Sequence, residues 1–136
     1  MKRRHFLQIA AVGTAAAGIP LTSSATTAAA VPPALDALAH PQILQRIGAH
    51  RLIREIGDAY RDLNSRENDA DRLASLIRAD LPEGVATIQS RNGELRAALD
   101  RQIRSDFEYG RTVELRGWIL SVTEARQCAL YSILYA

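Results

Sequence analysis

A helical period of apolar residues between positions 43 and 63 constrains the fold of this chain more than any other feature. The apolar side chains are separated by three or four residues, or by the sum of two such steps. They are Ile43, Ile47, Ile53, Ile56, Tyr60 and Leu63. Such spacing places them on one face of an α-helix. Pro41 suits the first turn of that helix, because its missing N–H costs nothing there. We therefore expect one helix over residues 41–63.

Two more helices are expected in the middle of the chain. The first has an apolar pattern that ends at Pro82 and Gly84, and it carries Leu73, Leu76, Ile77 and Leu81. Its start is expected at Asn64, because Asn64 and Glu67 have the spacing of a capping box. The second has apolar residues at steps of four, and Gly110 follows it where a left-handed residue ends a helix; these residues are Leu95, Leu99, Ile103 and Phe107.

The C-terminal part of the chain predicts a hairpin followed by a last helix. Two short β-prone pieces flank Arg116-Gly117, which favours a two-residue turn within residues 112–120. Ser121 and Glu124 match a capping box, which predicts a helix over Val122 to Leu134. The sequence thus predicts a mainly α fold, a small bundle of three to four helices with at most one short β-hairpin.

The first thirty residues have a different composition and predict a cleavable signal peptide. A basic cluster precedes an uncharged run over residues 6–21, and small residues follow. That run is shorter than the roughly 20 apolar residues that span a bilayer, although a retained anchor stays an alternative. Ala28 and Ala30 place the cut after Ala30, and a cut after Ala25 is the other choice. The predicted organisation is a signal peptide at 1–30, a linker at 31–40 and a helical domain at 41–136.

The residues KRRHFLQ resemble the twin-arginine (Tat) export motif. Arg3, Arg4, Phe6 and Leu7 match it, whereas Lys2 and Gln8 stand where other residues are usual. The resemblance implies export of an already folded protein to the periplasm. The implied partners are the Tat translocase and signal peptidase, with only transient contact with the membrane.

The C-terminal stretch GWILSVTEARQCAL resembles a recurring tail of small proteins with a twin-arginine signal, a family to which no activity is attached. In signal, size and helical content, the chain is also similar to small accessory subunits of periplasmic flavin or molybdenum oxidoreductases, such as the third subunit of gluconate 2-dehydrogenase. That likeness implies an escort that carries a larger periplasmic subunit through the export pathway.

Charge and cysteine content limit the other classes of function. Three of the 17 basic residues lie in the signal segment, so the mature chain has slightly more acidic than basic residues. Nucleic-acid binding needs clustered positive charge and is not expected. The single cysteine cannot form an intramolecular disulfide, so packing alone must hold the domain.

No residue pattern in the mature chain predicts catalysis, and no cofactor is expected. His40 and His50 are ten residues apart, which is not the helical spacing that converges on one metal ion. We expect His50 to be packed with one hydrogen bond, and Cys128 to be a buried apolar residue. A metal site that includes His50 and Cys128 is the alternative, and it would make the chain a stand-alone metal- or ligand-binding protein.

The strongest candidates for contact with a partner lie near the C-terminus. Trp118 begins the densest apolar cluster of the mature chain, and we expect it either to fill the core beneath the hairpin or to anchor a partner. Tyr131, Leu134 and Tyr135 belong to an uncharged tail, which must be buried in the chain's own core or in a partner.

Overall fold

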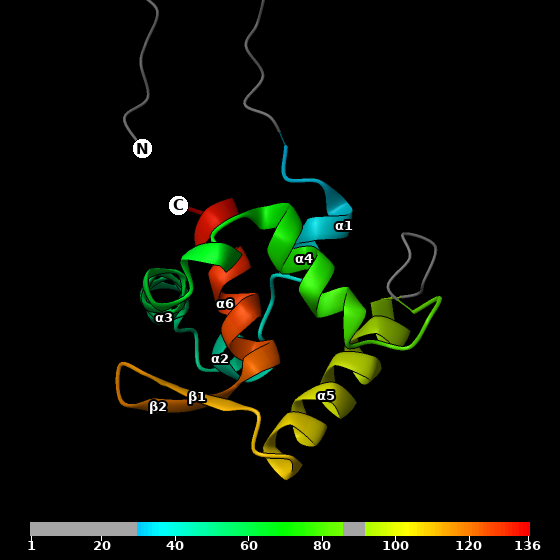
Figure 1. Ribbon diagram of the computed structural model, residues 1–136. Helices are drawn as coiled ribbons and strands as arrows, with labels where there is room; N and C mark the ends of the chain where they lie inside the picture. The colour runs from blue at the N-terminus through cyan, green and yellow to red at the C-terminus, as the bar shows by residue number, and fades with distance from the viewer. Residues whose placement is uncertain (1–29, 86–91) are drawn as a thin grey trace, which may run out of the picture.

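The computed structural model describes residues 30–85 and 92–136, and Figure 1 shows their arrangement. The export motif of Arg3, Arg4, Phe6 and Leu7, together with Ala25 and Ala28, lies outside the described residues. Within them the structure has six α-helices, one 3-10 turn and one hairpin, which confirms the mainly α prediction. The elements are α1 (Pro33–Asp36), α2 (Gln42–Arg46), α3 (His50–Leu63), η1 (Ser65–Glu67), α4 (Ala70–Ala79), α5 (Asn92–Glu108), β1 (Thr112–Leu115), β2 (Trp118–Ser121) and α6 (Val122–Leu134).

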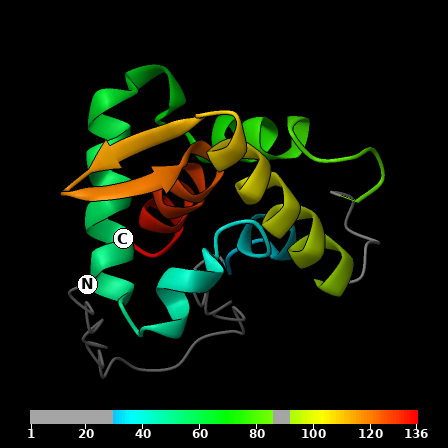
Figure 2. The same cartoon turned by 90° about the horizontal axis from the view of Figure 1, so that it is seen from below.

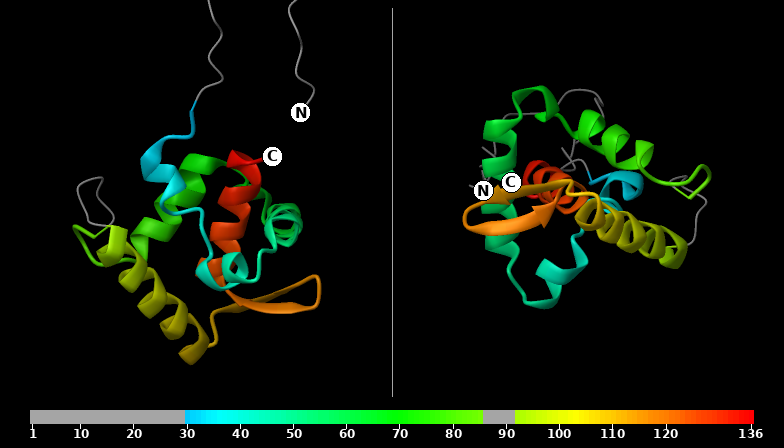
Figure 3. Two further views of the ribbon diagram at one scale, coloured as in Figure 1. Left: turned by 180° about the vertical axis from the view of Figure 1, so that it is seen from behind. Right: turned by 60° about the horizontal axis from the view of Figure 1, so that its bottom comes forward.

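Helix α6 occupies the centre of the molecule, with α3, α4, α5 and the hairpin around it (Figures 1 and 3). Most of its residues are buried, on every side of the helix. A helix that is apolar all round is stable only when it is enclosed. The uncharged tail is therefore enclosed largely by the chain's own core.

At Gly57 the backbone of α3 lies directly against the backbone of α6. A Cβ atom at Gly57 would lie 2.1 Å from the carbonyl oxygen of Cys128 and 2.6 Å from its carbonyl carbon. Only a hydrogen atom fits between the two helices at this point. The contact brings Ile53 and Ile56 of α3 into the core, where both are fully buried.

The single helix predicted over residues 41–63 is wrong, because a turn at Gly48 divides it into α2 and α3. Gly48 has a φ of 67°, a left-handed conformation that glycine adopts at low cost. Its N–H donates to the carbonyl of Gln45, and the N–H of Ala49 donates to the carbonyl of Leu44, which is the Schellman pattern. The break changes the apolar face, so that Ile43 and Ile47 are exposed.

The linker predicted at residues 31–40 is also wrong, because most of this segment belongs to the folded domain. Pro33 begins α1, where a proline costs no hydrogen bond. Leu38 and Ala39 are fully buried in the core. The domain therefore begins near Pro32 rather than at Pro41.

The two middle helices are confirmed, but the predicted start of α4 is wrong. Asn64 forms no capping bond through its side chain to η1. Instead, Asp69 accepts a hydrogen bond of 2.9 Å from the N–H of Arg72, and α4 begins at Ala70. Helix α5 ends as predicted, with Gly110 in the left-handed conformation.

The hairpin and the last helix agree with the prediction. Strands β1 and β2 pair antiparallel, with Leu115 opposite Trp118. The turn residues Arg116 and Gly117 have φ values of 54° and 80°, as a type I′ turn requires. The capping box of Ser121 and Glu124 is present, and α6 spans Val122–Leu134. Seen from below in Figure 2, the hairpin crosses α6 and reaches α3.

Candidate functional site

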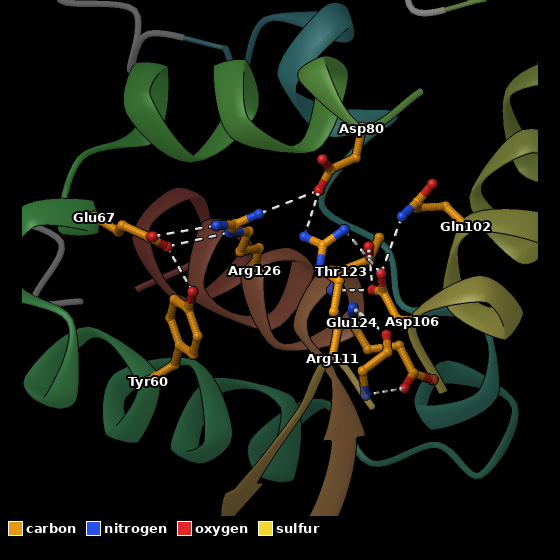
Figure 4. Close-up of polar contacts among 10 residues, drawn as sticks. Tyr60, Glu67, Asp80, Gln102, Asp106, Arg111, Thr123, Glu124 and Arg126 are labelled. Carbon is orange, nitrogen blue, oxygen red and sulfur yellow. Dashed lines mark hydrogen bonds and ion pairs between the residues drawn. The ribbon is translucent and has the colours of Figure 1, made fainter. Parts of the chain in front are cut away.

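The start of α6 is held by a buried carboxylate from another helix (Figure 4). Asp106 of α5 has no exposed surface. It accepts hydrogen bonds of 3.0 Å from the N–H of Thr123 and 2.7 Å from the hydroxyl of the same residue. Gln102 also donates to it, and the guanidinium of Arg111 lies 3.4 Å away. Asp106 therefore caps a helix that follows it by more than a dozen residues.

The other free N–H groups at this end of α6 are satisfied as well. The N–H of Val122 donates to the carbonyl of Arg111, and the N–H of Glu124 donates to the hydroxyl of Ser121. The carboxylate of Glu124 accepts from the N–H of Ser121. With all its donors engaged, this helix end has a structural role and offers no anion-binding site.

A second polar cluster ties η1 and α4 to α6 (Figure 4). Arg126 donates two hydrogen bonds of 3.2 Å to Glu67 and one of 3.3 Å to Asp80, which also accepts from Arg111. The hydroxyl of Tyr60 donates to Glu67 at 2.5 Å. Burial and the bond to Glu67 raise the pKa of Tyr60 to about 12, so its hydroxyl stays protonated near neutral pH. We interpret this cluster as a structural link that holds η1 and the end of α4 against α6.

Both histidines in the described part of the chain belong to a third cluster, which we call the His–Tyr cluster and define as Asp36, His40, His50, Tyr131 and Tyr135. His40 donates to Asp36 at 2.9 Å, and the hydroxyl of Tyr135 donates to the same carboxylate. His50 and the hydroxyl of Tyr131 share a hydrogen bond of 3.1 Å. The two tyrosine rings lie 4.7 Å apart between centroids. The cluster joins the N-terminal segment to the end of α6.

A small pocket lies beside the His–Tyr cluster. Its volume is about 240 Å³, and its polar lining comes from α1, α2, α5 and the segment between the first two; these residues are Asp36, His40, Gln42, Gln45 and Arg96. Gln45 also donates a hydrogen bond to Nδ1 of His40. The lining offers a carboxylate, a guanidinium, amides and an imidazole at one place, which suits a small polar molecule.

The hydrogen bonds of His50 and Cys128 do not join them in a shared site. His50 is exposed and bonded to Tyr131, so the expected single hydrogen bond is present but the expected burial is not. Cys128 is fully buried, and burial raises the pKa of its thiol far above the ordinary value. Among residues 30–85 and 92–136, no group of three His, Cys, Asp or Glu side chains is placed to hold a metal ion.

The candidates for partner contact differ in their exposure. Trp118 is 41% exposed, so the expectation that it fills the core beneath the hairpin is wrong. Tyr131 is 8% exposed and packs inside the fold, while Leu134 and Tyr135 are half-buried. Ile119, which belongs to the apolar cluster that begins at Trp118, is 65% exposed.

Several exposed apolar residues are carried by elements on one side of the molecule. These elements are α2, the C-terminal end of α5 and the hairpin, all visible from below in Figure 2. The exposed apolar residues that these elements and the residue after α5 carry are Ile43, Ile47, Phe107, Tyr109, Trp118 and Ile119, and we call this set of residues the hairpin face. Ile43 lines a shallow pocket together with Ile103 of α5, which places α2 next to that helix.

Sequence reasoning missed the residues that carry the polar clusters. The bonds of Asp106 to Thr123 and of Asp80 to Arg126 have no local signal, because these partners are more than a dozen residues away in the chain. Glu67 had a local signal, a capping-box spacing, but its carboxylate binds Arg126 and Tyr60 instead. Two pairs were open to discovery from their i,i+4 spacing, Asp36 with His40 and Gln102 with Asp106.

No helix in the described part of the chain has the length and apolar character needed to cross a membrane. Comparison with family models, with curated proteins and with solved structures found no match to this chain.

Proposed function

We propose that this chain is an exported accessory subunit that binds a larger periplasmic protein through the hairpin face. The observation that carries the proposal is the exposure of two large apolar side chains on one hairpin, Trp118 and Ile119, which as successive strand residues project from its two faces. Covering apolar surface gains about 25 cal/mol per Å². Tryptophan is also among the residues that dominate the binding energy of protein interfaces.

The hairpin is held rigidly enough to act as an anchor. Leu115 and Leu120 are buried beneath it, and the N–H of Val122 bonds to the carbonyl of Arg111 across its base. Asp106 fixes the start of α6, which follows β2 directly. An anchor that is already ordered loses little conformational entropy when it binds.

The export part of the proposal rests on the N-terminal sequence. Arg3, Arg4, Phe6 and Leu7 match the twin-arginine motif, and that pathway carries folded proteins. A partner without a signal of its own would cross with this subunit. The likeness to small subunits of oxidoreductases makes a redox enzyme the proposed partner.

Co-purification tests the binding part. Tagged protein from the periplasm should bring down one larger protein in a fixed ratio. A double substitution of Trp118→Ala and Ile119→Ser should lower the recovered partner at least tenfold. Leu63→Ala is the matched control, because Leu63 is a 69% exposed apolar residue at the end of α3 and outside the hairpin face. Wild-type protein that repeatedly emerges alone would contradict the proposal.

Replacement of the paired arginines tests the export part. Arg3→Lys with Arg4→Lys keeps the charge but removes the motif, so the full-length chain should remain in the cytoplasm. Cell fractionation followed by blotting measures how much of the chain is in the cytoplasm and how much is in the periplasm. Normal export of this variant would rule out the twin-arginine assignment, whatever the partner experiment shows.

The pocket beside His40 supports a second candidate, a protein that binds a small polar ligand. Asp36 and Arg96 give this pocket charges of both signs, and His40 adds an imidazole that can donate and accept hydrogen bonds. Native mass spectrometry of periplasmic protein would reveal a bound molecule. His40→Ala should remove it, while Arg51→Ala on the exposed face of α3 should not. Unliganded wild-type protein would argue against this candidate.

A further inference from the structure

The pocket beside the His–Tyr cluster lies where three helices meet. Asp36 ends α1, Gln42 and Gln45 belong to α2, and Arg96 belongs to α5. The volume of this pocket is about 240 Å³. Pockets that hold drug-sized ligands are larger, about 300–1,000 Å³. A ligand that fills this pocket is therefore smaller than a typical drug or nucleotide.

His40 orients two hydrogen-bond acceptors in the lining of this pocket. Its Nε2 donates to Oδ1 of Asp36 at 2.9 Å, and its Nδ1 accepts from the side-chain amide of Gln45. Tyr135 donates to the same oxygen of Asp36. These bonds leave Oδ2 of Asp36 and Oε1 of Gln45 without a partner in the described part of the chain. Both oxygens can accept a hydrogen bond from a ligand.

The two charges of the pocket come from Asp36 and Arg96, on different helices. The bond from Tyr135 lowers the pKa of Asp36, so its carboxylate is negative near neutral pH. The guanidinium of Arg96 has no hydrogen bond or ion pair with any residue in the ranges 30–85 and 92–136. A free guanidinium can bind a carboxylate through two parallel N–H bonds. The pocket thus offers one group for a cation and one for an anion.

The rest of the lining is mostly apolar and rigid. It comes from Pro33, Ala37, Leu95 and Leu99, and the two leucines are buried in the core. An aliphatic group that covers them removes apolar surface from water, which is favourable. The ligand that matches the whole lining has a carboxylate, a positively charged donor and an aliphatic part.

We propose that this pocket binds a small aliphatic amino acid, such as leucine, as its zwitterion. The ligand's carboxylate binds Arg96, its ammonium group donates to Asp36 and Gln45, and its side chain packs on Leu95 and Leu99. A ligand with a single charge would leave one charged group of the pocket unmatched. The inference rests on the second candidate function proposed above and deepens it, because it names the class of ligand.

Titration with L-leucine, followed by NMR, tests this proposal. Leucine added to the isotope-labelled full-length chain should shift the side-chain signals of Arg96 and Gln45, with saturation below about 10 mM. Isocaproate lacks the ammonium group and isoamylamine lacks the carboxylate, so each should bind at least about tenfold more weakly. Absence of saturation with leucine would overturn the inference, and so would an analogue that binds as tightly as leucine.

Two variants test the proposed contacts. Arg96→Gln should weaken leucine binding by about tenfold or more, because the charge-assisted bonds to the carboxylate are lost. Arg101→Gln is the matched control, since Arg101 is an exposed arginine of the same helix outside the pocket lining. Asp36→Asn should weaken leucine binding but leave isocaproate binding unchanged, a difference that general damage to the fold would not produce. Unchanged affinity for leucine in Arg96→Gln would overturn the inference.

Native mass spectrometry separates this inference from the candidate function on which it rests. A bound molecule that is not an amino acid would overturn the inference and leave the second candidate function standing. Protein that neither carries a small molecule nor binds leucine would overturn both. Binding of a partner through the hairpin face is tested independently of this pocket.

Discussion

Asp106 shows how one side chain connects two helices that sequence alone would treat separately. Its carboxylate accepts two buried hydrogen bonds from Thr123 and a partly buried one from Gln102. Removal of a buried acceptor leaves its donors without partners, and each such donor costs about 1–3 kcal/mol.

We therefore expect Asp106→Ala to lower the free energy of unfolding by about 3 kcal/mol or more. Glu108→Ala is the matched control, since Glu108 is exposed two residues further along α5. Urea denaturation followed by circular dichroism measures both. Equal stability of the two variants would show that the buried carboxylate is dispensable.

Gly57 gives a second prediction at the scale of a single residue. Gly57→Ala forces a methyl group against the carbonyl of Cys128, which cannot move without shifting α6. We expect a loss of about 1–3 kcal/mol, despite the higher helix propensity of alanine. Gly93→Ala is the control, because a Cβ there meets no atom within 4 Å. Thermal unfolding should give a lower melting temperature for Gly57→Ala than for Gly93→Ala. A Gly57→Ala protein as stable as wild type would disprove the close contact.

At the scale of elements, the hairpin turn is less favourable than it can be. Arg116 has a φ of 54°, and only Gly, Asn and Asp adopt this region readily. Arg116→Asn produces the Asn-Gly pair that type I′ turns prefer, and we expect a gain of about 0.5 kcal/mol. Gly117→Ala should instead cost about 1 kcal/mol, because φ is 80° there. Chemical denaturation tests the pair, and effects of the same sign would contradict this turn type.

The elements that the sequence predicted well are those with their own local signals. The Ser121–Glu124 capping box and Gly110 each end or start a helix through bonds within a few residues. The break at Gly48 was missed, because an apolar period of threes and fours continues through it. Glu67 was misassigned because the distant Arg126 binds its carboxylate. Local rules predict the helices, whereas contacts between helices decide how polar side chains are used.

At the scale of the whole molecule, carboxylates with opposite pKa shifts set the response to acid. Burial raises the pKa of Glu67, but hydrogen bonds from Arg126 and Tyr60 outweigh it and the pKa lies below its ordinary value. The bond from Tyr135 lowers the pKa of Asp36. A lowered pKa gives stability above the unfolded pKa, and this is lost as pH falls. Burial raises the pKa of Glu124, so its contribution has the opposite sign.

Glu67→Gln should therefore reduce the loss of stability between about pH 7 and about pH 3. Glu124→Gln should enlarge that loss, and glutamine still permits a capping box. Urea titrations at both pH values measure the difference for each variant against wild type. Changes of the same direction in both variants would contradict the assigned shifts.

The candidate sites were less predictable than the fold. Trp118 pairs with Leu115 and lies two residues before Leu120, so it shares a strand face with two buried residues. It is nevertheless exposed beside the Arg116-Gly117 turn, which strand alternation alone does not predict. The His–Tyr cluster needs residues from both ends of the domain, so its members gave only weak signals by themselves. Cys128 was correctly expected to be buried, because small apolar residues surround it on a helix that is enclosed.

The central position of α6 also sets when the domain folds during synthesis. Translation produces α3, α4 and α5 before residues 122–134 leave the ribosome. Until then Ile53, Ile56 and Leu73 lack the helix that buries them, so their side chains are exposed to water in the nascent chain. The core therefore cannot close until α6 has left the ribosome, and a chaperone that shields apolar segments can bind this chain until then.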